Sequence, residues 1–390
     1  MLTPPGIPDR TLIWGTAITQ FIGWGTLYFC FPLLVAPMEA ELGWSRVLIN
    51  GALTGGLLVA GLLAVPAGRW LDTRGARGMM TLGALAGALL LVAWSVVDHP
   101  VAYVVVWLAI GVVHATALWG PAMAVVVAEA RDPMRIITAI TFITGFTATV
   151  FLPLTELLVQ ALGWRGALQA LAAMQLVSAW LTWRMLRDAR PPAGDARSGP
   201  PAGLMRRLRD PAFLGLALCI AAHAFIATAL AAHLIPLLRE RGWPEATVLL
   251  IAAAQGPAQV AARALLYAAR QGLTMRRVGV FATALVPLAM IALALGGANI
   301  AMAALFMLLW SVGDGLMGIV RAAGTADILG REDYGAISGA LTAVSTLPRT
   351  SAPLIVALVW EGAGSYGPVP WLLAAVGALS VAGFIVAARR

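Results

Sequence analysis

The chain has 390 residues, of which 60% are hydrophobic and only 11% are charged, and its mean hydropathy is +0.86. Values this far from those of soluble globular domains indicate a polytopic membrane protein. The net charge is +8, and all 26 basic residues are arginines. Their placement along the chain accounts for this charge, so no nucleic-acid partner is predicted.

The N-terminal segment and the two cysteines show no sign of processing or metal chemistry. The first ten residues lack the basic start and the cleavage site of a signal peptide, and the apolar run that follows is too long for a signal core. Cys30 and Cys219 lie in separate apolar runs, without a Cys-x-x-Cys spacing or a histidine at ligand spacing. We therefore predict no disulfide, no metal and no cofactor.

Apolar stretches close to the roughly 20 residues that cross a bilayer as a helix recur in two groups of six. They predict an all-α membrane fold of twelve transmembrane helices. The first six spans are expected at 11–38, 47–67, 79–97, 101–128, 136–160 and 167–186, and the second six at 211–238, 247–268, 278–296, 300–328, 336–360 and 369–388.

The arginines predict how the chain is oriented. With a cytoplasmic N-terminus, nineteen arginines fall in the inner segments and four in the outer loops. Because cytoplasmic loops carry the excess of basic residues, we expect a multi-pass protein of the cell's inner (plasma) membrane with both termini in the cytoplasm. The other three arginines, Arg263, Arg321 and Arg349, lie within predicted spans.

Two halves are predicted, because a sequence pattern repeats. The segments PMEAELGW (37–44) and PLLRERGW (236–243) share Pro, Glu, Gly and Trp at the same spacing, an offset of 199, and Pro153 and Pro353 repeat at an offset of 200. This indicates two six-helix bundles related by a pseudo-two-fold axis, with a substrate held between them. The predicted domains are an N-terminal bundle (1–186), a cytoplasmic linker rich in Pro, Gly, Ser and charge (187–210) and a C-terminal bundle (211–390).

The loop after the second span reads Gly68-Arg-Trp-Leu-Asp72-Thr-Arg74-Gly75-Ala-Arg77-Gly. It resembles the signature of the major facilitator superfamily, although the first arginine follows Asp72 by two residues instead of one and Gly78 replaces the last basic residue. The resemblance implies a latch that holds one face of the protein closed, with the gating residues Gly68, Asp72, Arg74, Gly75 and Arg77. Ordinary loop charge is the alternative reading for Arg74 and Arg77.

At finer resolution, ELGWS after the first span and LGWRGAL after the fifth resemble the branch of monocarboxylate porters and oxalate/formate exchangers. In that branch, arginines on helices 8 and 11 bind carboxylates. The resemblance implies the same role for Arg263 and Arg349. The fifth span lacks the Gly-Pro pair of many drug/proton antiporters, which disfavours drug export without removing it.

Polar residues inside the spans recur at helical spacing and so form stripes. Lipid cannot solvate a polar stripe, so each should face a water-filled cavity or the bundle interior. An arginine within a span costs roughly 2.5–3.5 kcal/mol, which an anionic ligand would offset. The candidate substrate-binding residues are Arg349, Ser345 and Thr346 in span 11, Gln255, Gln259 and Arg263 in span 8, and Gln20, Trp24 and Tyr28 in span 1.

Asp314 and His114 are the candidates for proton coupling. They lie 200 residues apart, at equivalent depths of spans 10 and 4, and are the residue types best suited to carry a proton. A structural histidine, bonded to a backbone carbonyl or a tryptophan, is the alternative for His114. A structural role is also the preferred interpretation of His223. For Arg321 we expect an ion pair with Asp314.

These patterns predict a secondary active transporter that moves a small organic anion by alternating access. A carboxylate is the favoured substrate class, and a proton is the candidate coupled ion. The alternative is efflux of amphipathic or cationic drug-like compounds by proton antiport. No catalytic motif is present in the sequence, so we do not expect an enzyme. The expected partners are the lipid bilayer and a small molecule, and we expect a monomer.

Overall fold

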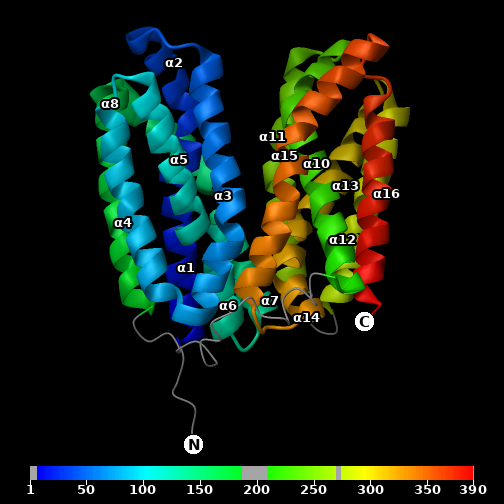
Figure 1. Cartoon of the computed structure of the whole chain (residues 1–390). Helices are drawn as coiled ribbons and strands as arrows, with labels where there is room; N and C mark the ends of the chain where they lie inside the picture. Colours follow the sequence, from blue (N-terminus) through cyan, green and yellow to red (C-terminus); the bar gives the residue numbers. More distant parts are fainter. Residues whose placement is uncertain (1–6, 187–208, 269–273, 390) are drawn as a thin grey trace, which may run out of the picture. The chain divides into compact units, whose positions relative to one another are not determined.

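The computed structural model describes residues 7–186, 209–268 and 274–389, and the chain divides into two compact units (Figure 1). The first unit comprises 1–199 and 333–340, and the second comprises 200–332 and 341–390. The described residues are almost entirely helical. The predicted linker falls mostly on 187–208, which lie outside the described residues, so the predicted domain boundaries stay a prediction.

The first unit has a core of large aromatic side chains. Phe31, Trp94, Tyr103 and Trp107 are buried together, while α4 packs against α5 and α8, and α3 packs against α5 (Figure 1). The elements are α1 (Asp9–Trp24), the π-helix η1 (Gly25–Phe29), α2 (Phe31–Leu42), α3 (Arg46–Arg74), α4 (Ala76–Ser95), α5 (Pro100–Ala117), α6 (Trp119–Glu129), α7 (Pro133–Thr144) and α8 (Thr147–Met185).

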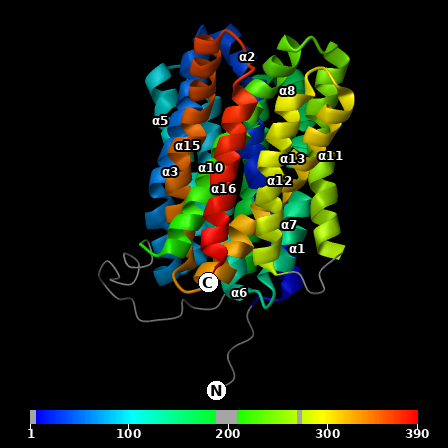
Figure 2. The ribbon, with the colours of Figure 1, turned by 90° about the vertical axis from the view of Figure 1, so that its right-hand side faces the viewer.

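The second unit has its own core, in which Ile226, Met290, Phe306 and Trp310 are buried. Figure 2 shows α16 between α10 and α12, with α13 on the far side of α12. The elements are α10 (Pro211–Glu240), α11 (Glu245–Ala268), α12 (Met275–Gly296), α13 (Ile300–Ile319), the π-helix η3 (Val320–Gly324), α14 (Thr325–Leu329), α15 (Tyr334–Ala363) and α16 (Val369–Ala388).

Twelve crossings account for these helices. Ten helical stretches of the described chain are long and apolar enough to cross a membrane. One of them, Pro133–Met185, has 53 residues, which is more than twice the roughly 20 needed for a crossing. It contains a non-helical residue, Gly163, with φ 68° and ψ 169°, which separates two spans. With α11 as a further span, the predicted twelve-helix fold is confirmed.

Several predicted spans are interrupted in the middle. The first contains η1, the fourth breaks at Leu118 between α5 and α6, the fifth breaks at Gly145 between α7 and α8, and the tenth contains η3. By contrast, α4, α12 and α16 run without a break. At membrane depth, irregular backbone is tolerated only where protein buries it or water reaches it.

The repeated motif builds the same structure twice. Gly43 ends α2 with φ 68°, and Gly242 follows α10 with φ 76°, a left-handed conformation that glycine adopts without strain. The glutamate two residues before each glycine accepts a hydrogen bond from an indole N–H: Trp164 donates to Glu41 at 2.6 Å and Trp360 donates to Glu240 at 2.8 Å.

Candidate intramembrane polar site

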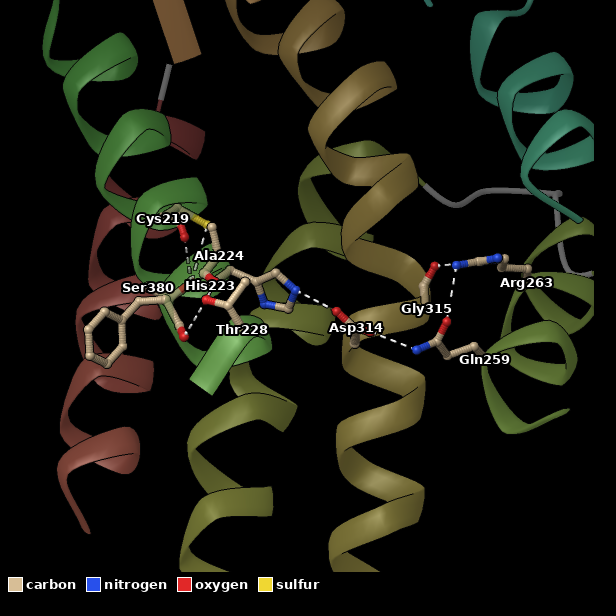
Figure 3. Close-up of polar contacts among 10 residues, drawn as sticks. Cys219, His223, Ala224, Thr228, Gln259, Arg263, Asp314, Gly315 and Ser380 are labelled. Atoms are coloured by element: carbon tan, nitrogen blue, oxygen red, sulfur yellow. Dashed lines mark hydrogen bonds and ion pairs between the residues drawn. The ribbon is translucent and has the colours of Figure 1, made fainter. Parts of the chain in front are cut away.

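Four polar side chains from three helices of the second unit form one hydrogen-bonded network (Figure 3). His223 of α10 lies with Nε2 2.8 Å from Oδ1 of Asp314 on α13. Gln259 of α11 donates from Nε2 to Oδ2 of the same carboxylate at 2.7 Å. Arg263, one turn further along α11, donates from Nε to the carbonyl of Gly315 at 3.0 Å and approaches Oε1 of Gln259 at 3.4 Å.

The backbone around this network is shaped to bring the three helices together. Gly315 has no side chain, and a Cβ there would lie 3.0 Å from the Cα of Gln259, so glycine lets α11 lie close to α13. On the other side, Ser380 of α16 donates to the carbonyl of Cys219 at 3.1 Å, one turn before His223 on α10 (Figure 3). The amide of Gln259 and the imidazole of His223 are thereby brought to opposite oxygens of Asp314.

The imidazole of His223 also stacks on a buried indole. Its ring centroid lies 5.6 Å from that of Trp310, one turn before Asp314 on α13, with an angle of 23° between the planes. The Nδ1 atom of His223 is buried and has no hydrogen-bond partner in the described part of the chain. The ring is therefore held by an aromatic face and by a single polar contact, the one to Asp314.

The two residues of the predicted ion pair, Arg321 and Asp314, each contact other side chains, and the ion pair stays a prediction. Asp314 contacts His223, and a guanidinium nitrogen of Arg321 donates to Oγ1 of Thr342 at 2.8 Å. Arg321 belongs to the π-helix η3, which follows α13.

The polar stripe of α15 lies in the second unit. Ser345 and Thr346 both donate to the carbonyl of Thr342, at 2.9 Å each, so their hydroxyl protons bond within their own helix. Arg349 is exposed one turn further on, between Pro348 and Pro353. On α11, Gln255 is half-buried one turn before Gln259.

In the first unit, the aromatic residues of span 1 surround a histidine. His114 is 8% exposed, its ring centroid lies 5.7 Å from that of Trp24 and 6.5 Å from that of Tyr28, and it hydrogen-bonds the backbone of Leu27. The Nε2 atom has no partner among the described residues. Gln20 is buried one turn before Trp24 and donates to the carbonyl of Ala117, the last residue of α5, at 3.1 Å.

The contact between Trp24 and His114 and the contact between His223 and Asp314 occupy equivalent positions of the repeat. Trp24 and His223 are 199 residues apart, and His114 and Asp314 are 200 apart, the two offsets that the sequence repeat shows. The first unit thus places a tryptophan against a histidine where the second places a histidine against an aspartate. The repeat offset, applied to His114 and Trp24 together, is the signal that could have predicted His223 as the partner of Asp314.

The residues predicted to form the gate lie at the end of α3 and the start of α4. Asp72 accepts two backbone hydrogen bonds from the start of α15, from Gly335 N–H at 3.0 Å and from Ala336 N–H at 2.8 Å, all within residues of the first unit. A Cβ on Gly68 would lie 2.0 Å from the carbonyl oxygen of Gly335, so only glycine allows this approach.

The other predicted gating residues follow Asp72 around the junction of α3 and α4. Gly75 has φ 83°, a value suited to glycine, and ends α3. The guanidinium of Arg74 lies over the ring of Trp70, and that of Arg77 lies over the ring of Trp183.

Two apolar helical units with polar residues held inside their spans define the chain as a polytopic membrane protein of carrier type. The family model of the Major Facilitator Superfamily matches residues 16–353, and the chain belongs to this family of membrane transporters. Transport by alternating access is typical of the family. The narrower resemblance to the monocarboxylate and oxalate branch remains a proposal. No curated protein matches the chain.

Solved structures with the same fold belong to transporters of different substrates. The chain is similar to FucP, a Major Facilitator Superfamily transporter in the outward conformation, with a TM-score of 0.79, 13% identity and coverage of 97% of this chain and 99% of that one. It is similar to the human organic anion transporter MFSD10 (TETRAN), with a TM-score of 0.74, 16% identity and coverage of 97% and 99%. A variant of FucP, the E. coli fucose:proton symporter, matches with a TM-score of 0.74, 14% identity and coverage of 95% and 97%.

Proposed function

We propose that this chain is a secondary transporter of small organic anions, with carboxylates as the substrate class and the proton as the coupled ion. The observation that carries the proposal is the charge balance inside the spans of the second unit. The predicted spans of the second unit contain three arginines, Arg263, Arg321 and Arg349, and two acids, Asp314 near the middle of its span and Asp327 near its end. The Asp314 carboxylate already accepts hydrogen bonds on both oxygens.

An anion is the ligand that this balance favours. A guanidinium keeps its charge in any protein, so an excess of arginines in a low-dielectric region attracts an anionic ligand. Its planar fork binds a carboxylate through two parallel hydrogen bonds. Arg349, exposed on α15 one turn after Ser345, is our first candidate for that contact, and Arg263 on α11 is the second.

Further candidate side chains lie in each unit. In the second unit, Gln255, Gln259, Ser345 and Thr346 would add hydrogen bonds to the anion. In the first unit, the candidates Gln20, Trp24 and Tyr28 carry an amide and two aromatic rings. Among proteins that share this fold, one is an organic anion transporter and another a fucose:proton symporter, so the choice of an anion rests on the charges of this chain.

Transport by purified protein in liposomes tests the proposal. We expect uptake of radiolabelled monocarboxylates or dicarboxylates such as lactate or oxalate. Arg349→Gln should weaken acid binding roughly 10–100-fold, because a charge-assisted hydrogen bond contributes about 1.5–3 kcal/mol. Arg349→Lys should restore part of the binding, since it keeps the charge but not the fork.

The matched control is Arg131→Gln, which removes an exposed arginine outside the site and should leave uptake unchanged. Equal uptake by wild type and Arg349→Gln, with equal folded protein in the membrane, would remove the central residue of the proposal.

A second candidate function, efflux of amphipathic or cationic compounds by proton antiport, is favoured by the aromatic cluster of the first unit. Trp24 and Tyr28 lie edge to face, with centroids 5.4 Å apart, beside His114. Aromatic faces attract cations and apolar rings. Transport of cationic dyes, with no transport of small acids, would select this alternative.

A further inference from the structure

We propose that His223 and Asp314 form the proton-binding site of this transporter, and that a proton bound there strengthens anion binding by the second unit. The second half of this inference rests on the proposed function. The first half concerns only the network of Figure 3 and can be tested without any substrate.

The hydrogen bonds assign the protons of the resting network. Asp314 receives the Gln259 amide on Oδ2 at 2.7 Å and faces His223 Nε2 from Oδ1 at 2.8 Å. An ionised carboxylate only accepts hydrogen bonds, so Nε2 must carry a hydrogen. In the neutral imidazole, Nδ1 then carries no hydrogen, and its lone pair can only accept a hydrogen bond. That atom is buried without a partner in the described residues, which an acceptor tolerates better than an N–H does.

The unoccupied lone pair is where an added proton can go. Protonation at Nδ1 turns the neutral imidazole into an imidazolium, whose charge is opposed by Asp314 at 2.8 Å. Imidazole is the side chain whose charge ordinarily changes between pH 5 and 8. The two side chains are partly exposed, Asp314 by 21% and His223 by 12%, although the Nδ1 atom itself is buried.

The surrounding charges explain why a proton would favour an anion. Arg263 interacts electrostatically with Asp314, and Gln259 links the two because it accepts a hydrogen bond from Arg263 and donates one to Asp314. Without the added proton, Asp314 offsets the charge of Arg263. With it, the carboxylate is offset by His223, and the positive charge of Arg263 attracts a negative ligand more strongly. By linkage, anion binding then strengthens proton binding by the same factor.

Other titratable groups of the neighbouring elements lie at helix ends or are engaged elsewhere. The elements that contact α10, α11 and α13 include α12, η3, α14, α15 and α16. Of these, α16 has no ionisable residue within Val369–Ala388. The ionisable residues on the other neighbouring elements are Arg276 and Arg277 at the start of α12, Arg321 in η3, Asp327 in α14, and Arg349 and Glu361 on α15.

The first unit supplies an internal comparison. Its equivalent positions hold Trp24 and His114, with no carboxylate at either, and His114 bonds a backbone group instead. A proton added there would have no opposing charge at that position. We therefore assign the proton to the second unit alone, to His223 rather than to His114.

A fluorescence titration tests the proton site without a substrate. The Trp310 ring stacks on His223, and an imidazolium quenches a stacked indole more strongly than a neutral imidazole does. In the wild type, we expect tryptophan fluorescence to decrease as the pH falls. This decrease should be absent in His223→Gln and in Trp310→Phe. His99→Gln, at the exposed start of α5, is the control and should keep it.

Asp314→Asn should diminish that transition, since the imidazolium loses its counter-charge. An unchanged transition in His223→Gln would overturn the proton site.

The coupling is tested by measuring acid binding and uptake against pH. In the wild type, the affinity for the acid should rise as the pH falls, by at most about tenfold per pH unit for one proton. In Asp314→Asn and His223→Gln, the affinity should no longer follow the pH, and a pH gradient should no longer drive accumulation, while counterflow exchange persists.

The two failures can be told apart. A protein that shows the fluorescence transition but binds acid equally at every pH would overturn the coupling and keep the proton site. A protein that shows the transition and binds no acid at all would overturn the proposed function, and with it the coupling.

Discussion

Asp72 acts as a helix cap from outside the helix that it caps. An N-capping side chain usually precedes its own helix by one residue, whereas Asp72 reaches the first turn of α15 from the end of α3, 263 residues earlier in the sequence. Its carboxylate meets two backbone N–H groups at the positive end of the helix dipole. The start of α15 is thereby grouped with the first unit, although the rest of that helix belongs to the second.

Asp72→Asn should loosen this start of α15. The asparagine keeps one oxygen but turns an NH₂ group towards the second N–H, and it removes the charge, a combined loss of about 1–2 kcal/mol. Hydrogen exchange measured by mass spectrometry should become faster for Gly335 and Ala336. Asp132→Asn is the control, because Asp132 caps its own helix, α7, by accepting from the N–H of Arg135, and its loss should leave exchange at Gly335 and Ala336 unchanged. Unchanged exchange at 334–340 would argue against the capping role.

Helices in each unit lie close where glycines meet. On α10 and α16, a Cβ on Gly215 would lie 2.5 Å from the carbonyl oxygen of Gly383, and a Cβ on Gly383 would lie 2.6 Å from that of Gly215. In the first unit, a Cβ on Gly111 of α5 would come 2.1 Å from the carbonyl oxygen of Gly56 on α3. Such pairs let backbones touch, which strengthens van der Waals packing where lipid offers no hydrophobic driving force.

Gly215→Ala should therefore lower the thermal stability of the purified protein, although alanine is the better helix former. The added methyl group meets backbone atoms, which cannot rotate away, and such overpacking typically costs about 1–3 kcal/mol. Gly78→Ala, on α4 with nothing within 4 Å, should be neutral or stabilising by up to about 1 kcal/mol. Thermal unfolding in detergent measures both, and equal shifts for the two variants would contradict the packing account.

At the scale of the whole molecule, the two cysteines make the topology directly testable. Cys30 and Cys219 are both free and fully buried, so a membrane-impermeant thiol reagent should leave the wild type unlabelled. The distribution of arginines predicts that the loop after α15 lies outside the cell and that the loop between α3 and α4 lies inside. Single cysteines at exposed helix ends beside these loops can distinguish the two sides.

We expect Ala363→Cys to react with the impermeant reagent in intact cells, and Gly78→Cys to react only after the membrane is opened. Both residues are exposed in the structure. A reporter enzyme that is active only in the cytoplasm should be active when fused to the C-terminus, and one that is active only outside the cytoplasm should be inactive there. Labelling of Gly78→Cys in intact cells would reverse the predicted orientation, and with it the cytoplasmic placement of both termini.

The fold can be predicted from the sequence further than the site can. Each long apolar run indicates a span, and the repeat that contains Glu41 and Glu240 is visible in the amino-acid sequence itself. The breaks at Leu118 and Gly145 are not predictable in this way, since the hydropathy of the chain does not change there. The polar stripes identify Asp314, Gln259 and Arg263 on two spans, but the sequence favours a structural role for their partner His223.

The twelve spans and the internal repeat follow from the sequence alone, because an apolar stretch long enough to cross a bilayer must become a helix whatever surrounds it. The partners of the buried polar groups are decided only by the tertiary structure. Asp314 meets a histidine 91 residues away, and Arg321 meets Thr342. Which side chains meet depends on the rotation of each helix and on a π-helical turn, and these are set by packing between helices distant in sequence.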